Sequence, residues 1–285
     1  MICAWKELLR VIPPGFRNEV DKYGREEAQE IRLRLGSPPE IRLGSRCVCV
    51  GDAVDKEDIY YCINTASRYS PWASETMQRG YLTAPGGHRI GICGQAVIRQ
   101  GRIEGVREIS ALCIRVAREF PGIAGELAEI PGSLLILGAP GWGKTTLLRD
   151  LIRQRTHRGA SVAVVDERGE LFPAGLCEAK GIDVMYGCSK ARGVEMLLRT
   201  MGPTVIAMDE ITAKEDCEAL QSAACCGVEL IATAHAASSR DFHHRPVYEP
   251  LVRQGLFDTL VVLHPDKTWT VERSGAWAAN GSVRY

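Results

Sequence analysis

The chain has 285 residues, of which 45% are hydrophobic and 25% charged, a composition that excludes disordered and fibrous classes. Its 35 Lys and Arg balance its 35 Asp and Glu, so no excess of positive charge favours a nucleic-acid partner. No apolar run approaches the roughly 20 residues that span a bilayer, and the N-terminus does not have the pattern of a secretory signal. We expect a cytoplasmic protein of two domains, without nucleic-acid binding or direct membrane insertion.

The 11 cysteines are scattered along the chain, and no two of them have the C-x-x-C spacing of zinc ribbons or thioredoxin-like proteins. Most of them lie in apolar stretches. The pattern therefore predicts reduced, buried thiols in a reducing compartment, with no structural metal.

The first part of the chain, residues 1–118, mixes short helical patterns with alternating strands and predicts a small α+β domain. We expect helices at 3–11, 16–23 and 56–79, the last broken at Pro71, and strands at 31–35, 41–43, 47–50, 86–94 and 112–117. Two prolines and three glycines then mark residues 119–132 as a linker with a short helix.

From residue 133 onwards the pattern changes to short apolar strands separated by longer helical segments. The expected strands are 134–137, 162–165, 205–208, 230–233 and 260–263, and the expected helices are 144–157, 193–201, 213–226 and 246–255. Strands that are apolar throughout are buried on both faces. Residues 133–285 are therefore predicted to form an α/β domain, a mostly parallel sheet with helices on both faces.

One octapeptide fits the phosphate-binding pattern G-x-x-x-x-G-K-[ST] at every fixed position. It consists of Gly138, Ala139, Pro140, Gly141, Trp142, Gly143, Lys144 and Thr145. It follows a predicted strand and precedes a predicted helix, the setting that such a P-loop requires. Its glycines let backbone N–H groups converge on phosphate oxygens, aided by the helix N-terminus. We expect Lys144 to contact the β- and γ-phosphates of ATP and Thr145 to bind Mg²⁺.

Two acids, Asp209 and Glu210, directly follow the apolar strand 205–208. A P-loop requires an acid on a neighbouring strand, which makes Asp209 the natural ligand of Mg²⁺. Glu210 is then suited to orient or deprotonate the attacking water. The alternative is a strand that ends in a solvated acidic loop.

Two further apolar strands end in polar residues. Asp166, Glu167 and Glu170 follow strand 162–165, and Thr233 and His235 end strand 230–233 or follow it. The carboxyl ends of parallel strands share one edge of a sheet, so these side chains are expected near the phosphates or the metal. A helix cap or a salt bridge with Arg168 is the alternative for the acids, and a structural histidine is the alternative for His235.

These motifs together resemble the stage III sporulation protein AA family of endospore-forming bacteria, and more distantly the hexameric ATPases of type II and type IV secretion. The resemblance extends from about Glu30 to Glu272. Its motifs are E-I-R-L-R at 30–34, G-Y-L-T-A-P-G-G-H-R-I-G at 80–91, the P-loop with its continuation to 150, V-D-E-R at 165–168, D-E-I at 209–211 and A-T-A-H at 232–235.

The resemblance implies a RecA-like P-loop ATPase core preceded by a smaller α+β domain. It implies a cytoplasmic ATPase of the mother cell, forming a homo-oligomer, most simply a hexamer, that docks on membrane-bound proteins of the channel to the forespore. The implied site comprises 138–146, which adds Thr146 to the P-loop, with 166–170, 209–210 and 233–235. Arg89 and Arg115 are the candidates for a charge-stabilising arginine finger, and salt bridges on an exposed sheet face are the alternative.

Two departures from the secretion ATPases stand out. Those proteins usually have Gly-Glu where this chain has Asp209-Glu210, and Trp142 is large for a P-loop position. Two other functions stay open: a nucleic-acid motor or loader, disfavoured by neutral charge and 6% aromatic residues, and a nucleotide-locked scaffold without turnover.

Overall fold

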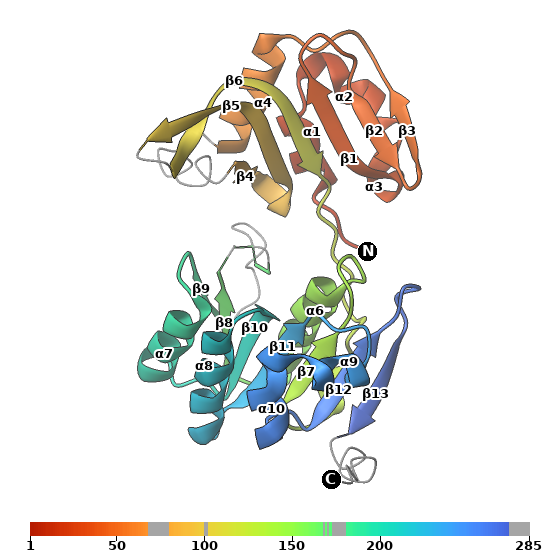
Figure 1. Cartoon of the computed structure of the whole chain (residues 1–285). Coiled ribbons are helices and arrows are strands. Elements are labelled where there is room, and N and C mark those ends of the chain that lie inside the picture. Colours follow the sequence, from red (N-terminus) through yellow and green to blue (C-terminus); the bar gives the residue numbers. More distant parts are fainter. Residues whose placement is uncertain (68–79, 100–101, 168, 170, 173–180, 274–285) are drawn as a thin grey trace. The chain divides into compact units, whose positions relative to one another are not determined.

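The computed structural model describes the chain apart from residues 68–79, 100–101, 168, 170, 173–180 and 274–285 (Figure 1). The described residues divide into two structural units, residues 1–119 and residues 120–273. The predicted break at Pro71 and the candidate Glu170 lie outside the described residues.

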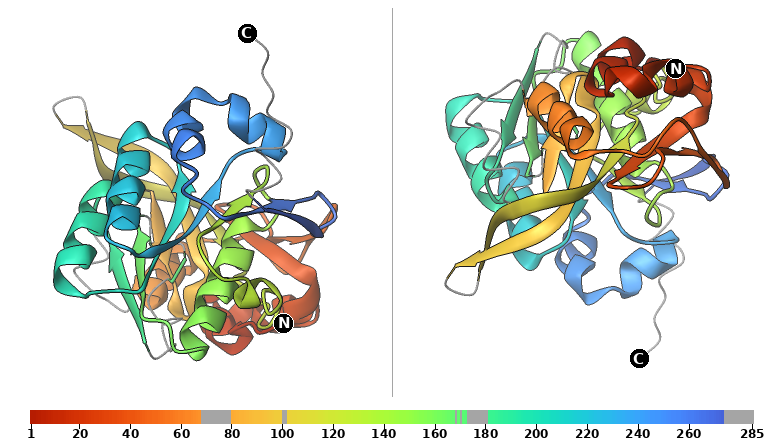
Figure 2. Two further views of the ribbon diagram at one scale, coloured as in Figure 1. Left: turned by 90° about the horizontal axis from the view of Figure 1, so that it is seen from below. Right: turned by 90° about the horizontal axis from the view of Figure 1, so that it is seen from above.

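The first unit is built on an antiparallel sheet of order β3-β2-β1-β6-β5-β4. Its elements are α1 (Trp5–Val11), α2 (Pro14–Asp21), α3 (Gly24–Glu27), β1 (Ala28–Arg34), β2 (Glu40–Leu43), β3 (Arg46–Cys49), α4 (Lys56–Ser67), β4 (Tyr81–Thr83), the 3-10 turn η1 (Pro85–Gly87), β5 (Arg89–Arg99) and β6 (Arg102–Arg115). β5 and β6 continue their pairing past the end of β1 and form a two-stranded ribbon (Figure 2).

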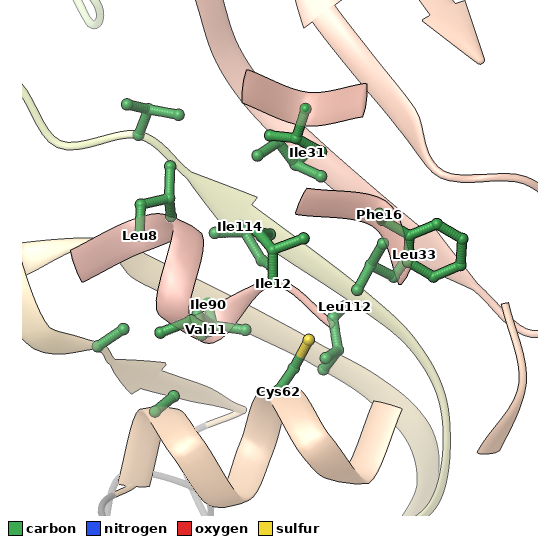
Figure 3. Packing of buried hydrophobic residues seen from close by; sticks show 14 of the residues in the cluster. Leu8, Val11, Ile12, Phe16, Ile31, Leu33, Cys62, Ile90, Leu112 and Ile114 are labelled. Carbon is green, nitrogen blue, oxygen red and sulfur yellow. The ribbon is translucent and has the colours of Figure 1, made fainter. Parts of the chain in front are cut away.

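The core of the first unit follows from the alternation in β1, where Ile31 and Leu33 are fully buried between more exposed charged neighbours. They pack with residues of the neighbouring strands and of the first helices, such as Leu8 and Ile12 (Figure 3). Cys62 of α4 is also fully buried in this cluster.

The expectation of buried thiols is nevertheless wrong for most of the described cysteines: Cys93, Cys225 and Cys226, which lie in apolar stretches, are exposed, and Cys113 is half-buried. An apolar neighbourhood in the sequence does not fix which face of a strand or helix a side chain occupies.

The second unit is built on a sheet of order β13-β12-β7-β11-β10-β8-β9, in which every neighbouring pair is parallel except β12 with β13. Its elements are η2 (Leu127–Glu129), β7 (Leu134–Leu137), α6 (Lys144–His157), β8 (Val162–Asp166), β9 (Ile182–Tyr186), α7 (Lys190–Thr200), β10 (Val205–Ile211), α8 (Lys214–Cys225), β11 (Glu229–Ala234), α9 (Ser239–His244), η3 (Pro246–Tyr248), α10 (Glu249–Gln254), β12 (Thr259–Leu263) and β13 (Trp269–Arg273).

Both faces of this sheet are covered by helices (Figures 1 and 2). In β7, Leu134 and Ile136 join the apolar cluster that includes the buried residues of α6. Leu135 and Leu137 point to the other face and join the cluster that includes α7, α8 and α10. A strand that is buried on both faces reads as a continuous apolar run, which is why the sequence pattern predicts this layer arrangement. The predicted α/β class is confirmed.

Some elements differ from the predicted ones. Residues 120–132, expected as a linker, contribute Ala124, Leu127 and Ala128 to the core of the second unit. Strands β4, β9 and β13 and helices α3 and α9 were not predicted, because each is short and the strands lie at the edges of their sheets. Within the part of the chain that the structure describes, no helix combines the length and apolar character needed to cross a membrane.

Candidate nucleotide-binding site

The carboxyl ends of β7, β10 and β11 lie side by side at one edge of the second sheet. Polar contacts there join five of the residues singled out from the sequence: Lys144, Thr145, Asp209, Glu210 and His235. They come from three segments that are far apart in the chain: the start of α6, the end of β10 and the residue after β11. The order of the strands in the parallel sheet is therefore sufficient to bring the predicted residues together.

The backbone of the P-loop is feasible only with glycine at specific places. Gly141 and Gly143 have φ angles of +79° and +103°, in the left-handed region that other residues rarely adopt. At Gly138 an added Cβ would lie 3.1 Å from Cβ of Leu263, so the loop packs tightly on β12. Gly143 is the N-cap of α6, whose first residue is Lys144. The loop thus leads directly into a helix N-terminus, which favours an anion such as phosphate.

Two further P-loop residues, Ala139 and Trp142, have contacts within the second unit. The carbonyl of Ala139 accepts a hydrogen bond from the backbone N–H of Trp142 at 3.3 Å and another from Nζ of Lys144 at 3.2 Å. The Trp142 side chain is half-buried and packs against the apolar cluster that includes the buried residues of α6. The large residue at this loop position therefore contributes to the core, and its contact with a nucleotide stays a prediction.

Asp209 is held by two hydroxyl groups. Thr145 donates to Oδ2 at 3.2 Å, and Thr233 donates to Oδ1 at 2.8 Å. Burial raises the pKa of Asp209 above its ordinary value, and the nearby charges of Asp166 and Glu210 raise it further, while the two hydroxyl donors lower it. A buried carboxylate beside other acids favours a cation. The hydroxyl of Thr145 and the carboxylate of Asp209 are hard oxygen donors, and they fit Mg²⁺, which keeps its other positions for water and phosphate oxygens.

Glu210 has a left-handed backbone, with φ of +48°, at an irregularity in the pairing of β10 with β11. Such a conformation costs free energy in a residue other than glycine and persists only where its surroundings enforce it. The backbone N–H of Glu210 donates to Oγ1 of Thr233 at 2.9 Å. Thr233 is fully buried and therefore fixes Asp209 through its hydroxyl hydrogen and Glu210 through its oxygen.

Lys144, His235 and Glu210 form a chain of polar contacts. Nζ of Lys144 lies 3.0 Å from Nδ1 of His235, and Nε2 of His235 contacts Oε1 of Glu210. An ammonium group can only donate, so Nδ1 accepts, and the ring hydrogen on Nε2 is directed to Glu210. Burial lowers the pKa of Lys144, and the carboxylates of Glu210 and Asp209 oppose that shift.

Sequence reasoning missed two residues at this site. Tyr248 has a hydroxyl oxygen 3.2 Å from the backbone N of His235, and Lys267 donates from Nζ to the carbonyl of Gly141 at 2.5 Å. Tyr248 lies in a 3-10 turn and Lys267 in the turn between β12 and β13. Neither belongs to a recognisable motif, so no sequence signal could have identified them.

The acids that follow β8 have partners of their own. Oδ2 of Asp166 accepts the backbone N–H groups of Leu171 and Phe172, at 2.8 and 3.0 Å. Oε2 of Glu167 lies 3.4 Å from Nζ of the buried Lys190. Asp166 thus acts as a cap of the following turn and Glu167 forms an ion pair. Their contact with phosphate or metal stays a prediction.

Arg89 and Arg115 belong to the first unit, on β5 and β6, where they are direct cross-strand neighbours. Nε of Arg115 lies 3.8 Å from Oε2 of Glu30. The guanidinium of Arg89 lies over the ring of Tyr81, 4.3 Å from its centroid. Both arginines therefore have contacts on their own sheet, and the role of either as a finger stays a prediction.

A mostly parallel sheet with a P-loop after one strand and an acid at the end of a nearby strand defines the P-loop NTPase fold. The chain belongs to the family described as Sporulation stage III, protein AA, whose model matches residues 6–283. It is 34% identical over 278 residues to "Stage III sporulation protein AA" of Bacillus subtilis (strain 168), and the match covers 90% of each chain. The family resemblance stated from the motifs is confirmed.

Solved structures of ATPases share the fold. The Legionella pneumophila ATPase DotB matches with a TM-score of 0.56 and 18% identity, over 90% of this chain and 78% of its own. The pilus retraction motor PilT with bound ADP matches with a TM-score of 0.58 and 17% identity, over 86% and 76%. At these identities the likeness concerns the fold, and it confirms the predicted RecA-like fold.

Proposed function

We propose that the protein is a Mg²⁺-dependent ATP hydrolase that powers or gates assembly or secretion through the channel between mother cell and forespore. One observation carries this proposal: Lys144, Thr145, Asp209 and Glu210 meet at a single edge of the sheet. Thr145 bonds Asp209 directly, and Lys144 and Glu210 are joined through His235. A glycine turn or an acidic loop that arose for structural reasons would not require the four to converge. The family and the fold support the same reading.

Each side chain has a distinct task in this reaction. The N–H groups of the P-loop and the ammonium of Lys144 bind the phosphates, and Thr145 and Asp209 hold Mg²⁺. When bound there, Mg²⁺ would supply positive charge that offsets the charge of the phosphates. Glu210 orients the attacking water and accepts its proton, an effect worth about 100- to 10,000-fold in rate for a positioned general base.

Phosphate oxygens would be further acceptors for the ammonium of Lys144. Two of its three hydrogens are used, by the carbonyl of Ala139 and by Nδ1 of His235. A phosphate that draws Lys144 away from His235 would leave the histidine with its contact to Glu210. The state of the phosphate site would thereby reach the group that prepares the water.

The wider role follows from the family. We infer a homo-oligomer, most simply a hexamer, that is cytoplasmic in the mother cell and docks on membrane-bound channel proteins. Arg115 or Arg89 would supply the charge-stabilising finger. The similar solved structures are those of an ATPase and a pilus retraction motor, and they support work driven by ATP rather than a scaffold without turnover.

Phosphate release from Mg-ATP by the purified chain tests the proposal, with Lys144→Ala as the inactive variant. Lys214→Ala is the matched control, because Lys214 is an exposed lysine of the same unit that pairs with Glu218. We expect turnover by the wild type and by Lys214→Ala, and a loss of at least about 100-fold in Lys144→Ala. Equal rates in all three proteins, or turnover only with added nucleic acid, would contradict the proposal.

A further inference from the structure

The hydroxyl group of Tyr248 joins the end of β10, which carries Glu210, to the segment that begins with His235 after β11. Its oxygen lies 3.2 Å from the backbone N of His235, 3.4 Å from the carbonyl oxygen of Ile211 and 3.5 Å from that of His235. Ile211 directly follows Glu210 in the chain. One buried side chain therefore contacts the backbone next to Glu210, at Ile211, and the backbone of His235, the two residues whose side chains contact each other being Glu210 and His235.

The ring of Tyr248 is itself fixed in place. Tyr248 is 3% exposed and belongs to the apolar cluster on the face of the sheet that α8 covers. Its ring stacks on Phe242, with centroids 5.0 Å apart and planes inclined by 28°. The neighbouring Val247 is also anchored, because its carbonyl accepts from Sγ of Cys217 at 3.2 Å. The hydroxyl is thus a rigid polar point in an apolar layer.

The hydrogen bonds of this hydroxyl are fully used. Its oxygen accepts the N–H of His235, and its single hydrogen is shared between the two carbonyls of Ile211 and His235. Burial raises the pKa of Tyr248 above its ordinary value, so the group stays protonated and can both donate and accept. A phenylalanine at this position would leave the buried N–H of His235 without this acceptor.

Glu210 needs support of this kind because its left-handed backbone is unfavourable. Thr233 holds the N–H of Glu210 from the neighbouring strand. Tyr248 holds the residue on the other side, through the carbonyl of Ile211. With both anchors, the short stretch around Glu210 has little freedom to relax.

We propose that Tyr248 is a positioning residue that aligns Glu210 and His235 for attack of water on the γ-phosphate. The proposal rests on the ATPase function proposed above. Tyr248 acts through its neighbours and has no contact of its own with the P-loop among the described hydrogen bonds. It should therefore affect the rate of hydrolysis and leave the binding of Mg-ATP unchanged.

The test compares kcat and KM of Tyr248→Phe with those of the wild type, using the full chain and Mg-ATP. We expect kcat to fall about tenfold, the effect of one buried hydrogen bond, with KM unchanged within about twofold. Tyr61→Phe is the matched control, because the hydroxyl of Tyr61 likewise accepts one hydrogen bond, in this case from the side chain of Arg17, and donates to a carbonyl, that of Arg10, in the first unit. Its kcat should equal that of the wild type.

Three results decide the matter. Tyr248→Phe with the kcat of the wild type, or with a rise in KM that accounts for the loss, overturns the inference. Tyr248→Phe is also combined with Glu210→Gln. If the double variant has the same kcat as Glu210→Gln alone, Tyr248 acts through Glu210. If the two changes lower kcat independently, the inference is overturned. If Tyr248→Phe does not fold, Phe242→Leu keeps the hydroxyl but removes the stacked ring, and an unchanged kcat there overturns the inference. A wild type without turnover instead refutes the ATPase function itself.

Discussion

Nζ of Lys144 lies 3.0 Å from Nδ1 of His235, so the cation of the P-loop is hydrogen-bonded to the residue that follows the neighbouring strand β11. His235 in turn contacts Glu210 at the end of β10. One chain of three ionisable groups thus links the start of α6, the end of β10 and the segment after β11. A phosphate that attracts Lys144 changes the surroundings of His235, and through it those of Glu210.

Asp209→Asn should make the nucleotide-free protein more stable at neutral pH. The pKa of Asp209 is raised by burial, so in the folded state the proton is held more tightly than at the ordinary value of 3.8. Below pH 3.8 the carboxyl group is protonated in both the folded and the unfolded protein, so its burial does not lower the free energy of unfolding through a buried charge. As the pH rises through the raised pKa, the folded protein must hold a buried charge, and stability is lost. Melting temperatures measured without Mg²⁺ should therefore be higher for the variant at pH 7 and converge towards pH 4.

The same variant should lose its response to Mg-ATP, because Asp209 is the proposed metal ligand. Asp52→Asn is the control, since Asp52 is an exposed acid of the first unit. It should melt like the wild type and leave stabilisation by Mg-ATP intact. A less stable Asp209→Asn at pH 7, or one that Mg-ATP stabilises as much as the wild type, would show that Asp209 serves the fold rather than the metal.

Gly193→Ala should destabilise the second unit although alanine favours a helix. Gly193 lies in α7, where the exchange would normally gain about 1 kcal/mol from helix propensity. An added Cβ, however, would lie 2.6 Å from Cγ1 of the fully buried Val165 on β8. Overpacking of a core costs roughly 1–3 kcal/mol, so we expect a net loss of up to about 2 kcal/mol. Urea unfolding measures it, with Glu195→Ala on the same helix as the control; a stabilised Gly193→Ala would contradict the packing.

The proposed ring makes a separate prediction about mass. Glu210→Gln retains Lys144 and Asp209, so it should bind Mg-ATP and remain in the state before hydrolysis. Light scattering should then show a change from a single chain to about six times that mass when Mg-ATP is added. A variant that binds Mg-ATP and stays monomeric would rule out a ring that assembles by itself.

Much of the second unit could be predicted because its signals are local. The central strands are short apolar runs, interrupted in β11 only by Thr233, and the P-loop is a contiguous pattern with fixed glycines. The edge strands β9 and β13 were missed, since a strand with one neighbour needs only short alternation and resembles a loop. The convergence of Lys144, Asp209 and His235 could also be predicted, because strand order in a parallel sheet brings the loops to one edge.

The missing parts of the site depend on contacts between distant residues. The left-handed backbone of Glu210 is enforced by Thr233, which lies on the neighbouring strand. Tyr248 reaches His235 from a turn that carries no motif. Glu167 contacts Lys190 only because α7 packs beside β8, and that packing is not encoded in the acidic run itself. Such contacts arise from tertiary packing, which a single sequence does not specify at the level of pairs.

The central claim is that this site hydrolyses ATP with Glu210 as the base, and one variant tests it most directly. Retention of labelled Mg-ATP and release of phosphate should be measured in the same sample of Glu210→Gln beside the wild type. We predict that the variant binds ATP as tightly as the wild type while phosphate release falls about 100- to 1,000-fold. Release at the rate of the wild type would contradict the account, because the acid after β10 would then have no part in the reaction.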